Sequence, residues 1–229
     1  MALIAASLRA AFRDVSRPLQ YSLMLFVAAL FALVGGYFMG GLAIVPYDID
    51  VAPALTAAFI VFIFSYIFVW YACELSESLG HRAYLSREEF LVRGFRVFLL
   101  WFLSYVVVFL LYSYLPPALG GLIAFFVTLL AVYASVVAAI DGYTISGAFR
   151  ESLAIVRDQL AHVAEFVVFS VLLLLPVFLV DAVLGFFGAV LAVMLVTFVV
   201  IPWLTAHAVL TYLYRYPIVV AALSKLEGL

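Results

Sequence analysis

Six stretches of mostly apolar residues, each about as long as a bilayer is thick, follow one another along the chain. They cover residues 19–41, 52–73, 97–115, 119–140, 163–183 and 185–213. A helix of about 20 apolar residues crosses the hydrocarbon core of a membrane. These runs are continuous, whereas the strands of a membrane barrel alternate in polarity over about 10 residues. The pattern predicts an all-α polytopic membrane protein with six transmembrane helices.

Short polar or helix-breaking segments separate the two members of each successive pair of spans. The separators are, in order, Pro46 with Asp48 and Asp50, Pro116 and Pro117 with Gly120 and Gly121, and Asp181 with Gly185. Proline removes a backbone donor and glycine weakens a helix, so both favour a reversal of the chain. The sequence therefore predicts three helical hairpins. Because no polar linker divides the chain, we expect a single membrane domain over residues 1–229.

Residues 146–163, between the fourth and fifth spans, carry charges together with a regular apolar stripe. Members of the stripe recur at intervals of four and three and are Phe149, Leu153, Val156, Leu160 and Val163. Charged residues such as Arg150 and Asp158 fall between them. This periodicity predicts an amphipathic helix lying on the membrane surface. Ser146 is the expected N-cap of that helix.

Similar segments precede the first and third spans. Arg9, Arg13 and Arg17 are spaced by four residues, as on one face of a helix. In the stretch "SREEFLVRGFR" (86–96), Ser86 and Glu89 have the spacing of a capping box. Glu89 and Arg93 form a favourable i,i+4 pair in that stretch. Each hairpin is therefore predicted to follow a cytoplasmic amphipathic interfacial helix, either as an internal repeat or because each hairpin needs such a helix.

Composition and charge refine this topology. Apolar residues make up 69% of the 229 positions and charged residues only 10%, against about 45–50% and about 25% in soluble domains. All eleven basic residues fall on one side of the predicted topology. The positive-inside rule then predicts that both termini are cytoplasmic, and we expect the plasma membrane of a prokaryote. A net charge of −2 argues against a nucleic-acid partner.

The expected partners are the lipid bilayer and its anionic headgroups. Basic residues at a membrane surface attract such headgroups, and those expected to do so are Arg9, Arg13, Arg17, Arg93, Arg96, Arg150 and Arg157. Another membrane protein or a second copy of the chain is the alternative partner. No cofactor is expected.

Two stretches carry a resemblance to a known group of proteins. They are "AIDGYTISGAFRESLAIVRDQ", which joins the fourth and fifth spans, and the ending "AHAVLTYLYRYP". With the six spans, they resemble poorly characterised, archaeal-type six-span membrane proteins related to the membrane domain of glycerophosphodiester phosphodiesterases. The resemblance covers nearly the whole chain. It implies a fold without an activity, because a phosphodiesterase catalytic domain has no counterpart in this sequence.

A second, partial resemblance concerns "EEFLVRG", residues 88–94. It is similar to the Glu-Glu-x-x-x-Arg signature of CAAX-protease-like intramembrane proteases, with Glu88, Glu89 and Arg93 at the signature positions. That resemblance implies paired carboxylates that activate a water, and it implies a site completed by His207 in "TAHAVLTY". A neighbouring like charge and a low dielectric raise the pKa of a carboxyl group, as a general base requires.

The sequence also departs from that protease pattern. The fourth span contains no histidine, and Thr211 stands where an asparagine or aspartate is usual. The competing interpretation treats Glu89 as part of a capping box on a solvated first turn. We favour the capping box.

A third constellation consists of Asp158, His162 and Glu165. Their spacing of i, i+4, i+7 predicts one helix face, and such ligands can hold a divalent metal. A metal site would need a further ligand such as His81 or His207. The interpretation we favour is a solvated face without metal.

Three functions are compatible with these patterns. The first is a non-enzymatic integral membrane protein with a scaffold, assembly or lipid-interacting role. The second is a transporter or channel subunit for a small solute, which the prolines inside the last two spans, Pro176 and Pro202, motivate. The third is an intramembrane hydrolase that uses Glu88, Glu89 and His207. We favour the first, and so a protein that is not an enzyme.

Overall fold

The computed structural model describes residues 19–29, 51–81, 85–217 and 219–221. Every regular element in this part of the chain is a helix, which confirms the predicted all-α class. After a first helix, Leu19–Ala29, come α3 (Val51–Ser78), α4 (Arg87–Tyr114), α5 (Pro117–Asp141), α6 (Ile145–Asp158), α7 (Leu160–Leu195), the π-helix η1 (Val196–Val200) and α8 (Ile201–Leu213).

Five segments are long and apolar enough to cross a membrane. They are Ala58–Ser78, Arg87–Tyr114, Pro117–Asp141, Leu160–Val180 and Leu191–Leu213, and they correspond to the second to sixth predicted spans. They are typical of a multi-pass membrane protein. The predicted first span is described only over Leu19–Ala29. The rest of that span, the loop with Pro46, and the basic segment with Arg9, Arg13 and Arg17 lie outside the described residues.

The predicted interfacial helix at residues 86–96 is not a separate element. α4 begins at Arg87 and continues without interruption to Tyr114, so this segment forms the first turns of a membrane-length helix. Gly94 lies inside the segment and brings α4 close to α3. A Cβ atom at Gly94 would lie 2.3 Å from the ring of Tyr66. The glycine therefore serves close packing between helices and does not break α4.

The surface helix predicted at residues 146–163 has different bounds in the structure. α6 begins after Thr144, whose side chain accepts a hydrogen bond from the Gly147 amide, so Thr144 and not Ser146 is the N-cap. The helix ends at Asp158, and Gln159 leaves the helical conformation with φ −124° and ψ 38°. Leu160 and Val163 therefore belong to α7.

The predicted apolar stripe is only partly on the face that α6 buries, since Phe149 and Val156 are half-buried against the core. The buried residues of α6 are Ala148, Ser152 and Ile155, whereas Leu153 is 56% exposed. α6 packs mainly against α5, which it follows in the chain. The small residues Ala148 and Ser152 on the buried face allow close approach of neighbouring backbones.

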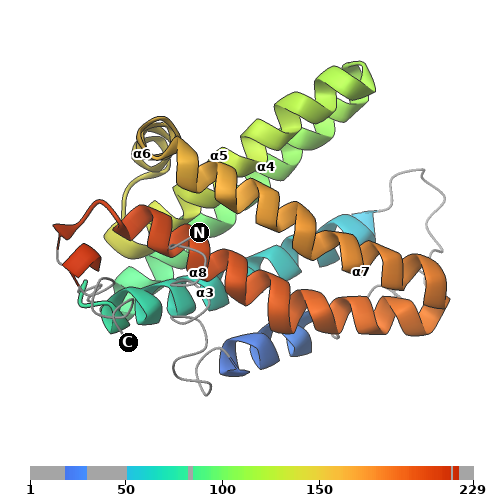
Figure 1. Cartoon of the computed structure of the whole chain (residues 1–229), viewed down its shortest axis with the longest axis horizontal. Coiled ribbons are helices and arrows are strands. Elements are labelled where there is room, and N and C mark those ends of the chain that lie inside the picture. Colours follow the sequence, from blue (N-terminus) through green and yellow to red (C-terminus); the bar gives the residue numbers. More distant parts are fainter. Residues whose placement is uncertain (1–18, 30–50, 82–84, 218, 222–229) are drawn as a thin grey trace.

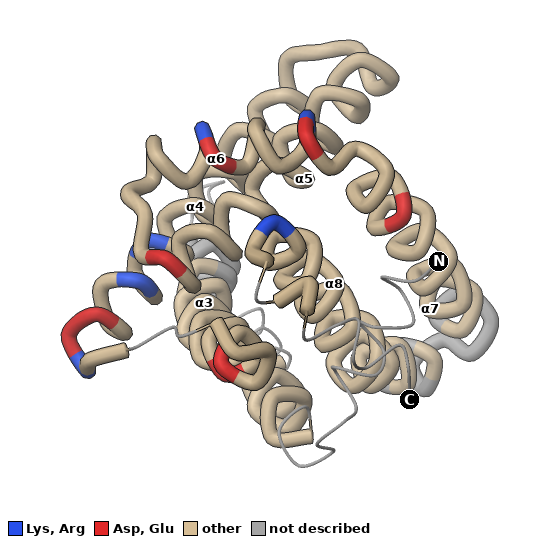
Figure 2. The backbone as a smooth tube through the Cα atoms, turned by 60° about the vertical axis from the view of Figure 1, so that its left-hand side comes forward, with Lys and Arg blue, Asp and Glu red and all other residues tan. Residues whose placement is uncertain are grey.

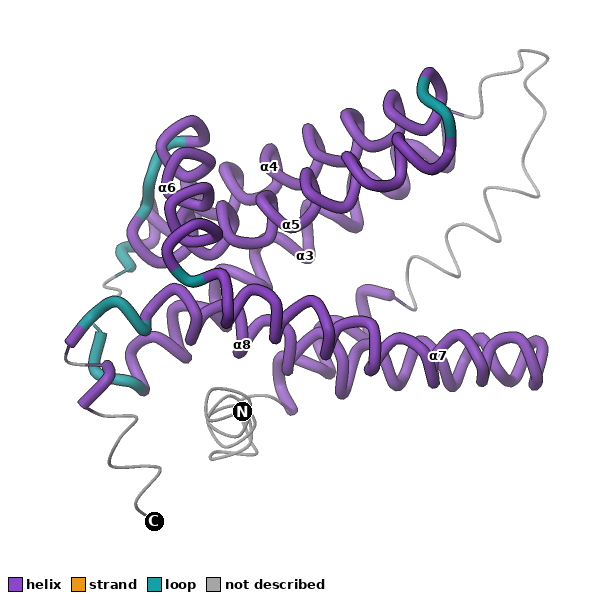
Figure 3. Tube along the Cα trace, turned by 45° about the horizontal axis from the view of Figure 1, so that its top comes forward, coloured by secondary structure: helices purple, strands orange, loops and turns teal. Residues whose placement is uncertain are grey.

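The helices form two arms that share one end (Figures 1 and 3). The first arm consists of α3, α4 and α5, and the second consists of α7, η1 and α8. In the second arm, the ring of Phe169 lies 5.7 Å from that of Trp203, and Phe166 lies 5.8 Å from His207. The parts of the chain before and after residues 181–190 are thus antiparallel. The backbone stays helical at Asp181 and Gly185, where a break between two spans was predicted.

The core lies at the shared end. Residues 133–140 of α5 and 205–213 of α8 are all buried. The first helix joins this region through Tyr21, which stacks on Tyr71 of α3 at 4.1 Å and has its hydroxyl 3.3 Å from that of Thr205. The arms are therefore held together where α8 crosses α3 and α5.

Charged residues are concentrated at the shared end as well (Figure 2). The arginines of the described residues are found at the start of α4, on α6 and after α8, and are Arg87, Arg93, Arg96, Arg150, Arg157 and Arg215. Contacts between Arg93 and Ala139, and between Arg215 and Glu151, join these segments. The far ends of the arms therefore differ from the shared end in charge as well as in packing.

Candidate functional site

Asp141, the last residue of α5, is the centre of a polar cluster at the shared end. Its Oδ2 atom accepts a hydrogen bond from the hydroxyl of Tyr212 and another, of 3.0 Å, from the hydroxyl of Tyr216. Its Oδ1 atom lies 3.3 Å from Nε2 of His81. We call these four residues the Asp141 cluster. One carboxylate thereby joins the ends of α3, α5 and α8.

Arg215 extends this cluster to α6. Its guanidinium pairs with the carboxylate of Glu151 and lies over the ring of Tyr212, 4.5 Å from the ring centre. An Nη2–H group of Arg215 also donates to the Tyr212 hydroxyl at 3.3 Å. A guanidinium over an aromatic face and beside a carboxylate is a favourable arrangement for a partly buried cation. The short helix α6 is thus tied to the end of α8.

Two arginines of α4 bind the C-terminal end of α5. Arg93 donates to the carbonyl oxygens of Ala139, at 3.0 Å, and of Ile140. Arg96 donates to the carbonyl oxygen of Gly142. The last carbonyls of a helix lack partners within the helix and carry its partial negative charge, so cations stabilise this end.

This arrangement corrects the predicted pair between Glu89 and Arg93. The Arg93 side chain is directed to the neighbouring helix α5. The Glu89 carboxylate instead accepts a hydrogen bond from the Ser86 amide, at the start of its own helix. Gly142 permits the approach because it adopts φ 68°, and a Cβ there would lie 3.1 Å from Nε of Arg93. The basic residue predicted to face lipid headgroups therefore caps a helix of its own chain.

Chemically, the Asp141 cluster is a set of hydrogen bonds that meet at one carboxylate. Both tyrosine hydroxyls donate to the carboxylate, so it acts as the acceptor that holds three helix ends. Charge-assisted hydrogen bonds of this kind contribute about 1.5–3 kcal/mol each. The geometry is suited to fixing the two arms relative to each other.

The residues proposed for hydrolysis lie in two different environments. Glu88 and Glu89 are exposed in the first turn of α4. The predicted capping box is confirmed, since the Glu89 amide donates to Ser86 Oγ and the Ser86 amide donates to Glu89, both at 3.2 Å. His207 is instead fully buried in α8.

The ring of His207 lies between two aromatic rings. The centre of Trp203 is 5.5 Å away and that of Phe166 is 5.8 Å away, and both rings are nearly parallel to the imidazole. Nε2 of His207 lies 3.4 Å from the carbonyl oxygen of His162. The contacts of His207 within the described residues come from α7 and α8 and include neither Glu88 nor Glu89. The structure thus gives this histidine the surroundings of a core residue.

The three residues proposed as metal ligands do not share a helix face. Asp158 ends α6 and pairs with Arg157 at 2.8 Å, and this hydrogen bond lowers the pKa of the Asp158 carboxyl. His162 and Glu165 lie on α7, with Nδ1 and Oε2 3.8 Å apart. Within the described residues, no group of three or more histidine, cysteine, aspartate or glutamate side chains is arranged to hold a metal ion. The prediction of one face is wrong because Gln159 interrupts the helix.

Sequence reasoning missed the Asp141 cluster, although a signal was present. Asp141 follows directly on a long apolar run, where a carboxylate requires partners. Tyr212, Arg215 and Tyr216 end another apolar run with a spacing that places them together on a helix end. The segments "AIDGY" and "TYLYRYP", which follow the two apolar runs, meet here.

Comparison with known proteins found no relative of this chain. No family model, no curated protein and no solved structure matches the chain.

Proposed function

We propose that the chain is a non-enzymatic integral membrane protein that organises lipid or a membrane partner around two splayed arms. In this proposal the shared end lies at the cytoplasmic surface of a prokaryotic plasma membrane. Its outward-facing basic residues, such as Arg150 and Arg157, contact anionic headgroups. Arg93 and Arg96 serve the protein's own fold instead.

The proposal rests on the apolar surface that the arms expose. Only 17% of the apolar stretch within Leu160–Val180 is buried, and only 22% of the one within Arg87–Tyr114. The corresponding stretch within Pro117–Asp141 is 61% buried. The exposed side chains on α7 include the large apolar residues Val168, Val171, Leu172, Leu175, Phe178 and Leu179. Such surface is stable only against lipid tails or another apolar surface.

A direct test measures what this surface retains. Purification in a polymer that extracts protein with its surrounding lipid, followed by lipid analysis and mass spectrometry of the intact complex, identifies the bound molecules. We expect specific lipids, or a second membrane protein, to remain bound at fixed stoichiometry. Recovery of a bare chain after mild extraction would count against the proposal.

A transporter or channel subunit is the second candidate, and one observation favours it. Five residues of the second arm, Val196–Val200, form a π-helix that ends two residues before Pro202. Both features interrupt the regular helical hydrogen bonds and often mark a hinge at a functional site. A hinge here would let the α7 side of the arm move against α8.

Flux measurements separate these two candidates. Proteoliposomes that contain the chain are loaded with amino acids, sugars or inorganic ions and compared with protein-free liposomes. A scaffold or lipid-organising protein leaves the leak rate at the protein-free level. Saturable uptake that disappears on replacement of the π-helix by a regular helix, through deletion of one residue of 196–200, would establish transport instead.

A further inference from the structure

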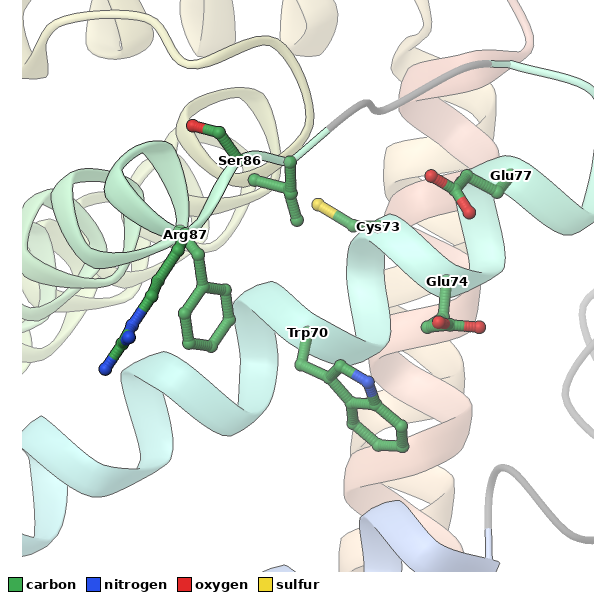
Figure 4. Close-up of a pocket in the computed structure, with 8 residues that line it drawn as sticks. Trp70, Cys73, Glu74, Glu77, Ser86 and Arg87 are labelled. Carbon is green, nitrogen blue, oxygen red and sulfur yellow. The ribbon is translucent and has the colours of Figure 1, made fainter.

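A cavity of about 510 Å³ opens between the last turns of α3 and the first turn of α4 (Figure 4). A volume of this size is typical of sites for small molecules. Glu74, Glu77 and Arg87 contribute charges to its lining, but the Arg87 side chain points away from both glutamates (Figure 4). The charged side chains therefore do not face a single ligand group, and the apolar part of the lining is the part that can define a ligand.

The apolar part of the lining comes from both helices and from the residue before the N-cap of α4. It consists of Trp70, Cys73, Leu85 and Phe90. Leu85 and Phe90 pack against the hydrophobic core of the shared end. The Cys73 thiol donates to the carbonyl oxygen of Ala139 at 3.3 Å. Walls that are fixed in this way lose little conformational entropy when a ligand binds.

A strip of aromatic side chains continues from the cavity along α3 and α4. The members of this aromatic strip are Phe62, Tyr66, Phe90, Phe95, Phe98 and Phe102. The centres of neighbouring rings lie between 4.9 and 6.0 Å apart. Phe90 is the ring that lines the cavity, and Phe102 lies twelve residues further along α4. At a rise of about 1.5 Å per residue, the strip extends roughly 18 Å toward the far end of the arm.

The aromatic strip is held in place on its inner side and open on its outer side. Gly94 leaves room for Tyr66, since a Cβ there would lie 2.3 Å from the tyrosine ring. The Tyr66 hydroxyl donates to the carbonyl oxygen of Leu91 at 3.2 Å. Phe62, Phe95 and Phe102 are all exposed. The rings therefore form an ordered surface that is open to the surrounding lipid.

The exposed face of α7 differs from this strip in its chemistry. Its large side chains are mainly aliphatic, such as Leu172, Leu175 and Leu179. Aliphatic surface is matched by the tails of any lipid. Aromatic rings have a negative face and a positive edge, and ring pairs about 4.5–7 Å apart gain stability beyond the area that they bury. An aromatic strip that starts in a cavity therefore favours a lipid that itself carries a ring.

We propose that the cavity and the aromatic strip bind a membrane lipid that carries a quinone ring on an isoprenoid tail. The ring lies in the cavity against Trp70 and Phe90, and the tail follows the strip toward Phe102. Two carbonyl groups withdraw electrons from a quinone ring, so this ring stacks favourably on the negative faces of aromatic side chains. The inference names a lipid class for the lipid-interacting role proposed above and rests on that role.

The experiment compares three lipids on the full-length chain in detergent. They are a naphthoquinone with an isoprenoid tail, an alcohol with the same isoprenoid tail, and a phospholipid. Mass spectrometry of the intact complex measures the bound fraction of each lipid during a titration. We expect the naphthoquinone to bind about tenfold more tightly than the alcohol, because the two molecules share a tail and differ in the ring.

Substitutions by leucine separate the ring from the tail, because they keep an apolar side chain and remove an aromatic one. Phe90→Leu and Trp70→Leu should each reduce the tenfold preference to about twofold. Phe98→Leu, which alters the strip outside the cavity, should weaken the naphthoquinone and the alcohol alike. The two cavity variants lie on different helices, so the test does not depend on the folding of either one.

Phe109→Leu is the matched control for these variants. Phe109 is an exposed phenylalanine of α4, but it lies beyond the strip and does not line the cavity. Its substitution should leave the affinities for all three lipids unchanged. The unfolding midpoint of each variant, followed by circular dichroism, shows whether a lost preference reflects lost structure.

Three results would overturn the inference. They are equal binding of the naphthoquinone and the alcohol, a preference that survives in folded Phe90→Leu and Trp70→Leu, and an equal loss of preference in Phe109→Leu. If the phospholipid and the alcohol remain bound without a preference for the ring, the lipid-interacting role stands and only the quinone site fails. If none of the three lipids is retained, both proposals fail.

Discussion

The shared end of the molecule and the far half of α7 are built from equally apolar helices, yet they are packed in opposite ways. At the shared end, residues 133–140 read "YASVVAAI" and every one of them is buried. On α7, residues 171–180 read "VLLLLPVFLV", and Val171, Leu172, Leu175, Phe178 and Leu179 are all more than half exposed.

This difference shows which side chains hold helices together in a membrane. Lipid tails are as apolar as leucine, so large apolar side chains gain little by leaving lipid for protein. Small residues let backbones approach, and polar groups then find partners across the contact. The shared end has both, in its alanines and serines and in the Asp141 cluster. The far half of α7 has few of either, and it is left to lipid or to a partner.

The shared end should lose the most stability when the carboxylate at its polar centre is removed. Asp141→Ala takes the acceptor from Tyr212 and Tyr216 and the partner from His81. We expect a loss of about 3 kcal/mol in the free energy of unfolding, because buried donors are left without acceptors. Unfolding in mixed detergent micelles, followed by circular dichroism, measures the change.

Asp158→Ala is the matched control for that substitution. Asp158 is an exposed aspartate of the same end, whose carboxylate pairs only with its neighbour Arg157 among the described residues. Surface ion pairs contribute little, so the control should unfold as the unchanged protein does. Equal stability of the two variants would show that the Asp141 cluster does not hold the arms.

The second contrast compares two leucines. Leu210 of α8 is fully buried at the shared end, whereas Leu172 of α7 is 56% exposed. Leu210→Ala leaves a cavity between packed helices and should cost about 2 kcal/mol. Leu172→Ala removes contacts with lipid or detergent only and should leave the unfolding midpoint nearly unchanged. A similar cost for both would indicate that a second copy or partner covers α7 under the conditions used.

Two glycines of the first arm also differ in how closely they are packed. Gly94→Ala drives a methyl group into the ring of Tyr66, and we expect a cost of about 1.5 kcal/mol from the forced separation of α3 and α4. At Gly121, near the far end of the first arm, an added Cβ would have its nearest neighbour, the Tyr112 hydroxyl, at 3.6 Å. Gly121→Ala should therefore stabilise α5 slightly, since alanine is the better helix former. Thermal unfolding of the two variants should shift in opposite directions.

The smallest effect concerns the start of α6. Thr144→Ala removes the hydroxyl that accepts from the Gly147 amide and should cost about 1 kcal/mol. Ser146→Ala, two residues further on, removes an exposed hydroxyl inside the helix and should be nearly neutral. The two unfolding midpoints, compared under identical conditions, report which residue is the cap. If Ser146→Ala is the more damaging, the helix begins later than the structure has it.

Sequence patterns were sufficient where the physics is local. Apolar runs predicted six spans, and the second to the sixth are membrane-length helices in the described residues. Pro116 and Pro117 marked the turn between α4 and α5, and the Ser86–Glu89 capping box was predicted from spacing alone. Each depends on hydropathy, a backbone donor or contacts within one turn. The resemblance to six-span membrane proteins and the cytoplasmic placement of the termini stay predictions.

Hydropathy and charge along the chain were enough to predict the helical class, the order of the helices and the basic character of one end. Which faces of the helices meet depends on the folded protein, where Ala148, Ser152 and Ile155 of α6 are buried and Leu153 is exposed. The tertiary structure also decided that Arg93 caps α5 and that Asp141 joins three helix ends. The physical reason is that hydropathy does not distinguish lipid from a neighbouring helix. Close approach and hydrogen bonding between distant segments make that choice, and neither is visible along one chain.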